Sequence, residues 1–371
     1  MRLLYVVANA EYFLSHRLAL AKAAQALGFD VAVATTQFKE NDYIQIGRIK
    51  SFLVKFKRGS LNPFVELKTV FSLLRVFREF KPSLVHNVAL KPALYGTMIA
   101  RIYKVPSVNA INGFGYIFTS YHLRARLLRP FVKYALKLIL NHSHVSVIVQ
   151  NQQDYLTCKA LLPKSNLYFV PGSGVDTKIF YPALNKGAKI FTFTLVARML
   201  WTKGVKEFVE AAKEFVKNNP SQKVRFLLIG SPDLENPESI PLAILEKWNE
   251  EGIVEWLGHV DNVQKIYAQT HVAVLPSYRE GLPKSLLEAM ACGLPIITTD
   301  AIGCDEIVNE GNGIKVPTKN IESLKEAFEK CISNKPMCKL MGNRGREQAE
   351  NLYSSDIINL KITNIYNKIL K

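Results

Sequence analysis

Two acidic residues, Glu280 and Glu288, stand eight positions apart in the stretch PSYREGLPKSLLEAMACGLP, residues 276–295. Gly281 and Pro283 interrupt the chain between them, which predicts a loop carrying Glu280 and then a short amphipathic helix carrying Glu288. Pro283 suits the first position of that helix, because its missing N–H costs little there. The free amides and positive dipole end of a helix start favour phosphate. The pattern therefore indicates a ligand-facing loop suited to a nucleotide sugar.

The same two carboxylates could instead be the acid and nucleophile of a glycoside hydrolase, whose carboxyl groups stand about 5 to 9.5 Å apart. Eight helical steps of about 1.5 Å each would separate the two backbones by roughly 12 Å. Because the Gly281–Pro283 break makes that figure indicative only, the hydrolase stays open as the less favoured alternative. Either glutamate alone would be uninformative, since surface helices commonly carry glutamate.

Two cations stand in LVARMLWTKG, residues 195–204, where a predicted strand ends and a helix opens. Arg198 and Lys203 would lie at the carboxyl end of that strand, a position suited to a diphosphate. Each charge-assisted hydrogen bond to phosphate contributes about 1.5 to 3 kcal/mol. Cations placed where charge develops on a leaving group also stabilise the transition state more than the ground state. Alternatively, the two cations have no ligand: Arg198 would form a surface ion pair, and Lys203 would simply stand at the start of a helix.

The order Glu, seven residues, Glu, followed by Ala-Met-Ala-x-Gly-x-Pro, resembles the signature of the retaining GT-B glycosyltransferases of family 4. That family also has Arg followed by Lys-Gly where this chain has Arg198 and Lys203. The resemblance implies that both cations bind the diphosphate of a UDP-sugar. It also implies that Glu288 binds the ribose hydroxyls and Glu280 the donor sugar, so that Glu280, Arg198 and Lys203 are catalytic. The remaining implied donor-binding residues are Gly230, His259, Gly281, Leu282, Pro283 and Lys284.

Candidates in the N-terminal half match the family less well. Its first loop reads ANAEYFLSHR and a later one VNAINGFGYIF, where family members often have a Gly-Gly loop and a strand-end His. These two loops and the end of the predicted strand 84–86 still offer side chains that could contact the donor or the acceptor. His16 and Arg17 could instead simply begin a helix. The candidates are His16, Arg17, His86, Asn112 and Gly113.

A narrower resemblance is carried by SLNPFVELK (60–68), ARMLWTKGVKEF (197–208) and PSYREGLPKSLLEAMACG (276–293). These segments are similar to bacterial family members that act on undecaprenyl-diphosphate-linked saccharides in N-glycan, O-antigen or capsule assembly. The resemblance implies a UDP-sugar donor, with UDP-GalNAc preferred over UDP-GlcNAc or UDP-Gal, and a lipid-diphosphate-linked saccharide acceptor. No cofactor is expected. Because the chain has no Asp-x-Asp motif, we expect metal-independent transfer in which Arg198 and Lys203 stabilise the leaving group.

The charge of the chain is uneven along its length. The 371 residues carry a net charge of +17, of which residues 1–180, with 24 Lys+Arg and 8 Asp+Glu, hold +16. Such a bias indicates nucleic acid, anionic lipid or a diphosphate substrate as partner. Basic and large apolar residues alternate at 51–64 and 121–140, which favours an anionic membrane surface, although a core-facing helix with a solvated basic face fits the second segment equally well. No nucleic-acid-binding motif is present, so nucleic acid is not an expected partner.

The expected location is the cytoplasm, at the inner face of the membrane. No apolar run reaches the roughly 18 to 20 residues of a spanning helix. The first residues, MRLLYVVANAEYFLSH, are interrupted too early for a signal peptide. Five cysteines without a CxxC pair indicate free thiols in a reducing compartment.

Short β-branched runs alternate with helical patterns, which predicts an α/β protein with two Rossmann-like domains facing across a cleft, the GT-B fold. The N-terminal domain is expected at 1–170, after which 170–182, rich in Gly and Pro, serves as linker. A nucleotide-sugar-binding domain is expected at 183–353, and a last helix at 354–371 that returns to the first domain, as in GT-B proteins. The predicted strands are 3–7, 31–34, 84–86, 107–110, 145–149, 190–196, 224–229, 253–256, 271–275 and 296–299.

Two other activities remain open. The same architecture could serve a UDP-sugar 2-epimerase, which would act on UDP-HexNAc without any lipid acceptor. A non-enzymatic nucleic-acid binder would use the basic half alone and would show no affinity for UDP.

Overall fold

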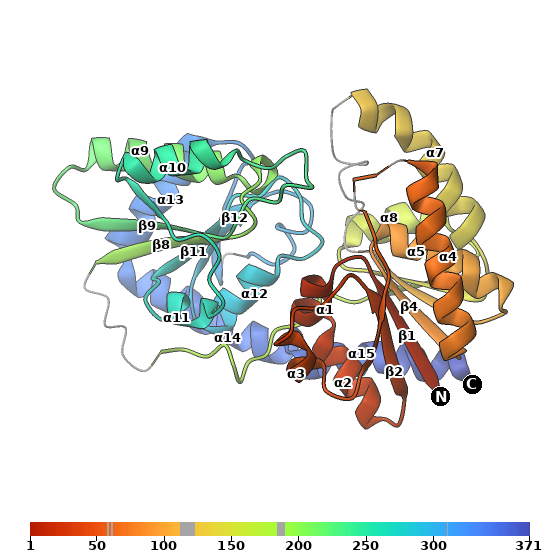
Figure 1. Ribbon diagram of the computed structural model, residues 1–371. Helices are drawn as coiled ribbons and strands as arrows, with labels where there is room; N and C mark the ends of the chain where they lie inside the picture. Colours follow the sequence, from red (N-terminus) through yellow and green to blue (C-terminus); the bar gives the residue numbers. More distant parts are fainter. Residues whose placement is uncertain (58, 61, 112–122, 184–189, 310) are drawn as a thin grey trace. The chain divides into compact units, whose positions relative to one another are not determined.

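The computed structural model describes residues 1–371 except 58, 61, 112–122, 184–189 and 310 (Figure 1). The chain forms two compact units, each with its own core. Unit 1 comprises Met1–Ser173 together with Ile358–Lys371, and unit 2 comprises Gly174–Ile357. The C-terminal residues therefore belong to the same unit as the N-terminus.

Unit 1 contains a seven-stranded sheet in the order β3-β2-β1-β4-β5-β6-β7, and every pair of neighbours is parallel. The central strands are buried on both sides, and β1 and β6 are mostly apolar, as expected for a sheet covered by helices on each face. The strands are β1 (Arg2–Val7), β2 (Asp30–Thr35), β3 (Lys50–Leu53), β4 (Leu84–Val88), β5 (Ser107–Ile111), β6 (Val145–Val149) and β7 (Asn166–Phe169).

Helices cover both faces of this sheet, because successive side chains of each strand point to opposite sides. Leu3 and Tyr5 of β1 pack into the core beneath the first two helices and the last one, whereas Leu4 and Val6 pack beneath the helices of the opposite face. The first layer holds α1 (Ala10–His16), α2 (Leu18–Ala26), α3 (Asp42–Ile46) and α15 (Ser355–Leu370). The second holds α4 (Pro63–Phe80), α5 (Leu90–Ile102), α7 (Leu123–Leu140) and α8 (Gln152–Leu161).

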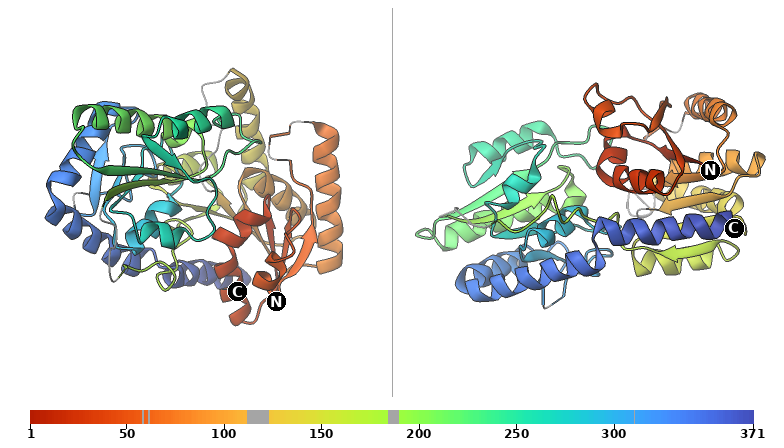
Figure 2. Two further views of the ribbon diagram at one scale, coloured as in Figure 1. Left: turned by 60° about the vertical axis from the view of Figure 1, so that its left-hand side comes forward. Right: turned by 90° about the horizontal axis from the view of Figure 1, so that it is seen from below.

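The C-terminal helix α15 lies along the elements of unit 1 (Figure 2), and a buried tyrosine anchors it to the sheet. The hydroxyl of Tyr366 lies 3.1 Å from that of Tyr5 and 2.5 Å from Nδ1 of His86. Ile358, Ile362 and Tyr366 all belong to the same apolar core as β1. Buried polar groups of this kind lose their pairing if the helix detaches, so the contact fixes the end of the chain.

Unit 2 contains a six-stranded parallel sheet in the order β10-β9-β8-β11-β12-β13. Its core is rich in aromatic residues, with Phe193, Phe226 and Phe328 in mutual ring contact. The strands are β8 (Phe191–Val196), β9 (Val224–Ile229), β10 (Val254–Trp256), β11 (Val272–Leu275), β12 (Ile296–Thr299) and β13 (Gly313–Val316). The helices are η1 (Trp201–Lys203), α9 (Val205–Asn218), α10 (Leu242–Glu250), α11 (Val263–Tyr267), α12 (Lys284–Ala291), α13 (Ile321–Ser333) and α14 (Lys335–Leu352).

The predicted α/β class and the ten predicted strands are confirmed, with bounds that shift by at most two residues. Three strands escape prediction, namely β3, β7 and β13, and each lies at an edge of its sheet. Their sequences, KSFL, NLYF and GIKV, are only four residues long. Because an edge strand is covered on fewer sides, it lacks the continuous apolar run by which the central strands are recognised.

The apolar spacing of residues 14–27 predicts one helix, which Arg17 divides into α1 and α2. The backbone of Arg17 (φ −128°, ψ −15°) leaves the helical region, and its side chain is only 2% exposed. The helical periodicity on either side is similar, so the break has no clear sequence signal.

All five cysteines are buried thiols. In the part of the chain that the structure describes, no helix combines the length and apolarity needed to cross a bilayer.

Candidate active site

The site predicted from sequence is built around the loop between β11 and α12 of unit 2. Ser277 and Tyr278 attach this loop to η1, because the Ser277 hydroxyl and the Tyr278 amide both donate to the carbonyl of Thr202, at 3.1 and 2.9 Å. On the other side, the amide of Glu280 donates to the carbonyl of Ile302 at 2.9 Å. The loop is thus held between the segments that follow β8 and β12, all at the carboxyl ends of parallel strands.

Two glycines allow the backbones around the loop to approach closely. A Cβ on Gly204 (φ +71°) would lie 2.0 Å from the carbonyl oxygen of Pro276. A Cβ on Gly303 (φ +78°) would lie 2.3 Å from the carbonyl oxygen of Glu280. Any other residue would clash and also adopt a left-handed backbone, so these positions require glycine.

Glu280 and Lys203 are brought into direct contact. The Nζ of Lys203 donates a short hydrogen bond to Oε1 of Glu280, and the side chains are only 18% and 12% exposed. The two residues are 77 positions apart in the sequence, and they meet because β8 lies next to β11 in the sheet. The pair therefore places one cation and one carboxylate, each mostly shielded from water, at the same edge of the sheet.

Glu288 lies one turn into α12, beside Lys284. The carboxylate is 14% exposed, and the Nζ of Lys284 lies 3.5 Å from its Oε1, a favourable i,i+4 pairing. Burial raises the pKa of Glu288, and the charge and hydrogen bond of Lys284 oppose that rise. Pro283 is the residue before the helix rather than its first residue, with φ −73° and ψ 108°, because α12 begins at Lys284. That corrects the predicted helix start by one position.

Arg198 follows β8 and forms an ion pair on the surface of unit 2. Its guanidinium lies 2.6 Å from Oδ2 of Asp233, and its side chain is 52% exposed whereas that of Asp233 is 9% exposed. The Asp233 amide donates to the Ser239 hydroxyl at 3.0 Å, which steadies the acidic partner. The surface ion pair that was the alternative to a phosphate contact is thus present, and the guanidinium still has donors on its exposed side.

Gly230 and His259, two of the implied donor-binding residues, occupy different environments. Gly230 has φ +135°, and a Cβ there would lie 1.8 Å from the carbonyl oxygen of Ala197, so it serves the close approach of two strand ends. Its amide donates to the Gly258 carbonyl at 2.7 Å, and its own carbonyl accepts from the Trp256 indole at 2.8 Å. His259 is 73% exposed and lies 3.2 Å from Asp261.

The N-terminal candidates are not gathered at one point. His16 is half-buried and stacks on Tyr12 with ring centroids 4.1 Å apart. Arg17 and His86 are buried, at 2% and 0% exposure, and His86 lies in the middle of β4 rather than at its end. In this conformation both side chains are shielded from solvent, and their contact with donor or acceptor stays a prediction. Asn112 and Gly113 lie outside the described residues.

Sequence reasoning missed Tyr278, which attaches the Glu280 loop to α9. Its hydroxyl donates to Oε1 of Glu207 at 2.5 Å, and the Nζ of Lys319 lies 4.8 Å from its ring centroid. Glu207 is only 8% exposed, and burial is the main cause that raises the pKa of Tyr278. A tyrosine two residues before a catalytic candidate has no special spacing, so no sequence signal points to this contact.

Within the described residues, no three His, Cys, Asp or Glu side chains lie together in a way that could hold a metal ion.

Comparison with known proteins gives matches in both halves of the chain. Residues 176–348 match the profile of the family described as "Glycosyl transferases group 1", and residues 2–151 match that of "Glycosyl transferase 4-like". The N,N'-diacetylbacillosaminyl-diphospho-undecaprenol alpha-1,3-N-acetylgalactosaminyltransferase of Campylobacter jejuni is 28% identical over 97% of this chain and 98% of its own length. The UDP-Gal:alpha-D-GlcNAc-diphosphoundecaprenol alpha-1,3-galactosyltransferase of Escherichia coli is 28% identical over 79% and 77%.

A solved structure with a similar fold is that of Anabaena Alr3699/HepE in complex with UDP and glucose, with a TM-score of 0.78 and 15% identity. The match covers 99% of each chain. Together, the two family profiles, the parallel sheets of both units and this structural likeness establish that the chain belongs to the glycosyltransferases of the GT-B fold.

Proposed function

We propose that this glycosyltransferase moves a sugar from a UDP-sugar to a saccharide carried on a polyprenyl diphosphate, with retention of anomeric configuration and without a divalent ion. The observation that carries the proposal is the shielded contact between Lys203 and Glu280, on the loop that leads into α12, the helix that carries Glu288. Both named relatives act on diphospho-undecaprenol-linked sugars, and the Alr3699/HepE structure holds UDP and glucose.

In this proposal unit 2 binds the donor. Lys203 and Arg198 hold the diphosphate, together with the backbone N–H groups of Gly281, Leu282 and Lys284 at the start of α12. The carboxylate of Glu288 accepts hydrogen bonds from the two ribose hydroxyls, and that of Glu280 accepts from hydroxyls of the donor sugar. Gly230 and His259 border the base.

Bond breaking then depends on stabilising the departing UDP. The C1–O bond of the donor breaks as negative charge develops on the diphosphate oxygen, where the ammonium of Lys203 and the guanidinium of Arg198 are most effective. The acceptor hydroxyl attacks the same face of the oxocarbenium-like sugar, and its proton passes to the leaving phosphate. Because these two cations neutralise the diphosphate, the proposal requires no metal ion and assigns no protein nucleophile.

Unit 1 is proposed to hold the acceptor at the inner face of the cytoplasmic membrane. Helix α7 exposes Leu127, Phe131, Tyr134 and Leu138, each 59–73% exposed, at the i, i+4, i+7, i+11 spacing of one helical face. Arg126, Lys133 and Lys137 of the same helix are also exposed. An apolar stripe flanked by cations is the pattern of a helix that lies in an anionic bilayer interface.

The donor sugar is proposed to be GalNAc. The Campylobacter jejuni relative transfers N-acetylgalactosamine, as its name states, and matches nearly the whole chain. The Escherichia coli relative, a galactosyltransferase, supports the alternative of an O-antigen or capsule enzyme with another UDP-hexose or UDP-HexNAc.

The test is transfer from a panel of UDP-sugars to undecaprenyl-diphosphate-linked saccharides in detergent, with and without EDTA. The proposal predicts α-linked transfer from UDP-GalNAc that EDTA does not abolish. Transfer only from another UDP-sugar would replace the donor assignment. C2 inversion of a UDP-HexNAc in the absence of acceptor would instead indicate the epimerase.

A further inference from the structure

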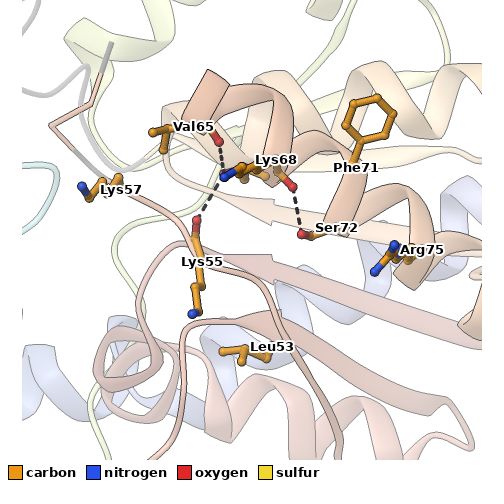
Figure 3. A pocket seen from close by; sticks show the side chains of 9 residues that line it. Leu53, Lys55, Lys57, Val65, Lys68, Phe71, Ser72 and Arg75 are labelled. Carbon is orange, nitrogen blue, oxygen red and sulfur yellow. Dashed lines mark hydrogen bonds between the residues drawn. The ribbon is translucent and has the colours of Figure 1, made fainter. Parts of the chain in front are cut away.

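A groove of about 550 Å³ lies in unit 1 between the segment that follows β3 and helix α4 (Figure 3). The side chains that give it its chemistry are four cations, Lys55, Lys57, Lys68 and Arg75, and two large apolar residues, Leu53 and Phe71. All six are exposed. The groove thus joins positive charge to apolar surface, and none of its residues belongs to the donor site of unit 2.

The first wall follows from the two-residue period of extended backbone. Leu53, Lys55 and Lys57 line the groove, while Val54 and Phe56 between them are buried in the core, at 0% and 6% exposure. The amide of Val54 bonds to the carbonyl of Thr35 at 2.7 Å and continues the pairing of β3 with β2. The cations are therefore held in place by the core residues that alternate with them.

The second wall is one face of α4. Lys68, Phe71 and Arg75 recur at the i, i+3, i+7 spacing that places side chains on one side of a helix. The opposite side buries Leu73 and Phe77 against the sheet. The helix is thus fixed by its apolar face and presents its basic face to the first wall.

Hydrogen bonds tie the two walls together. The hydroxyl of Thr69 on α4 donates to the carbonyl of Lys55 at 3.2 Å. From α5, the Nζ of Lys91 donates to the carbonyls of Lys57 and Ser60, at 2.6 and 2.7 Å. The groove is therefore formed before any ligand arrives, which lowers the entropy that binding must overcome.

The acidic residues of α4 are engaged by side chains other than the four groove cations. Glu66 accepts from Lys91 at 2.8 Å and from the Tyr95 hydroxyl at 2.6 Å. Glu79 accepts from Lys50 at 2.9 Å. Among the described residues, no acidic side chain forms an ion pair with any of the four groove cations. Their positive charge is left for an external anion.

We infer that this groove binds the diphosphate of the polyprenyl-linked acceptor, an inference that rests on the proposed function and adds a subsite to it. Four cations suit a diphosphate, which carries more charge than the single phosphodiester of most anionic phospholipids. Leu53 and Phe71 offer apolar contact to the first isoprene units, which a soluble nucleotide would not use. Since the cations are exposed, binding weakens as ionic strength rises.

The test measures farnesyl diphosphate binding to the full chain by calorimetry, with inorganic pyrophosphate and phosphatidylglycerol vesicles as comparison probes. The double variant Lys55→Gln/Lys68→Gln removes two positive charges from the groove and changes no side chain of the hydrophobic core. Its matched control is Lys22→Gln/Lys159→Gln, two exposed lysines of unit 1 on α2 and α8. We expect farnesyl diphosphate binding to weaken tenfold or more in the groove variant and less than twofold in the control. UDP affinity should be unchanged in both, because the donor site lies in unit 2.

In the transfer assay, the groove variant should raise KM for the lipid-linked acceptor while kcat changes little. Equal affinity of the wild type and the groove variant for farnesyl diphosphate overturns the inference. If the wild type binds inorganic pyrophosphate as tightly as farnesyl diphosphate, Leu53 and Phe71 have no role, and the inference is overturned as well. Loss of vesicle binding with farnesyl diphosphate binding retained would assign the groove to a phospholipid headgroup and also overturn it. Absence of transfer by the wild type to any lipid-diphosphate acceptor would instead refute the proposed function.

Discussion

The ammonium of Lys203 touches the carboxylate of Glu280, and both side chains are more than four-fifths shielded from solvent. The ion pair keeps both charged groups at the place where the diphosphate and a hydroxyl of the donor sugar are proposed to bind. A ligand that inserts here replaces one ion pair by two sets of charge-assisted hydrogen bonds.

Glu280→Gln and Lys203→Met should each reduce kcat at least about a hundredfold, the usual loss when one stabilising group for developing charge is removed. The fold should persist, as judged by circular dichroism. Arg225→Gln is the control, because Arg225 pairs with Glu255 at 2.6 Å in the same unit, on β9 and β10. Near-native turnover in either site variant would remove the assigned role.

Tyr278→Phe should lower kcat through the loop rather than through substrate contact. The change deletes the hydrogen bond to Glu207, whose other carboxylate oxygen is already buried without a partner. Leaving a buried carboxylate unbonded costs about 1 to 3 kcal/mol, so the unfolding temperature of unit 2 should fall. Tyr181→Phe, at a tyrosine that is 50% exposed, serves as control. Equal kcat and equal stability in both variants would show that Tyr278 does not position the loop.

Stability of unit 1 should fall as pH drops below about 6.5, the ordinary pKa of histidine. Burial, and then the charge of Arg17, hold the pKa of His86 well below that value. The unfolded chain therefore binds a proton that the folded chain does not, and the free energy of unfolding decreases by at most about 1.4 kcal/mol per pH unit in that window. His86→Gln should flatten this slope, as measured by hydrogen exchange in β4 between pH 5 and 7. An unchanged slope would contradict the assignment.

Arg126→Glu/Arg129→Glu/Lys133→Glu on α7 should reduce sedimentation with phosphatidylglycerol liposomes and reduce turnover on lipid-linked acceptor. Each basic residue near an anionic surface contributes about 1 kcal/mol. Phe131→Ser/Leu138→Ser tests the apolar stripe separately, and Lys22→Glu on α2 is the control. If liposome partition is the same in all variants, α7 is not the membrane contact.

The sequence predicts the fold well because buried central strands and amphipathic helices carry strong periodic signals. The sequence predicts poorly which distant side chains come into contact. The Glu280 loop is recognisable from its glycines and prolines, yet the contact of Lys203 with Glu280 depends on β8 lying beside β11, which no local pattern encodes. The sequence predicts that a strand ends at His86, but β4 continues for two more residues. The hydroxyl of the distant Tyr366 also contacts the His86 ring, so the side chain is buried.

The most direct measurement is a crystal structure of the chain with UDP bound. We expect the diphosphate to contact Lys203 and Arg198 and the ribose hydroxyls to bond to Glu288. Nucleotide bound elsewhere, or a ribose remote from Glu288, would contradict the proposed donor site.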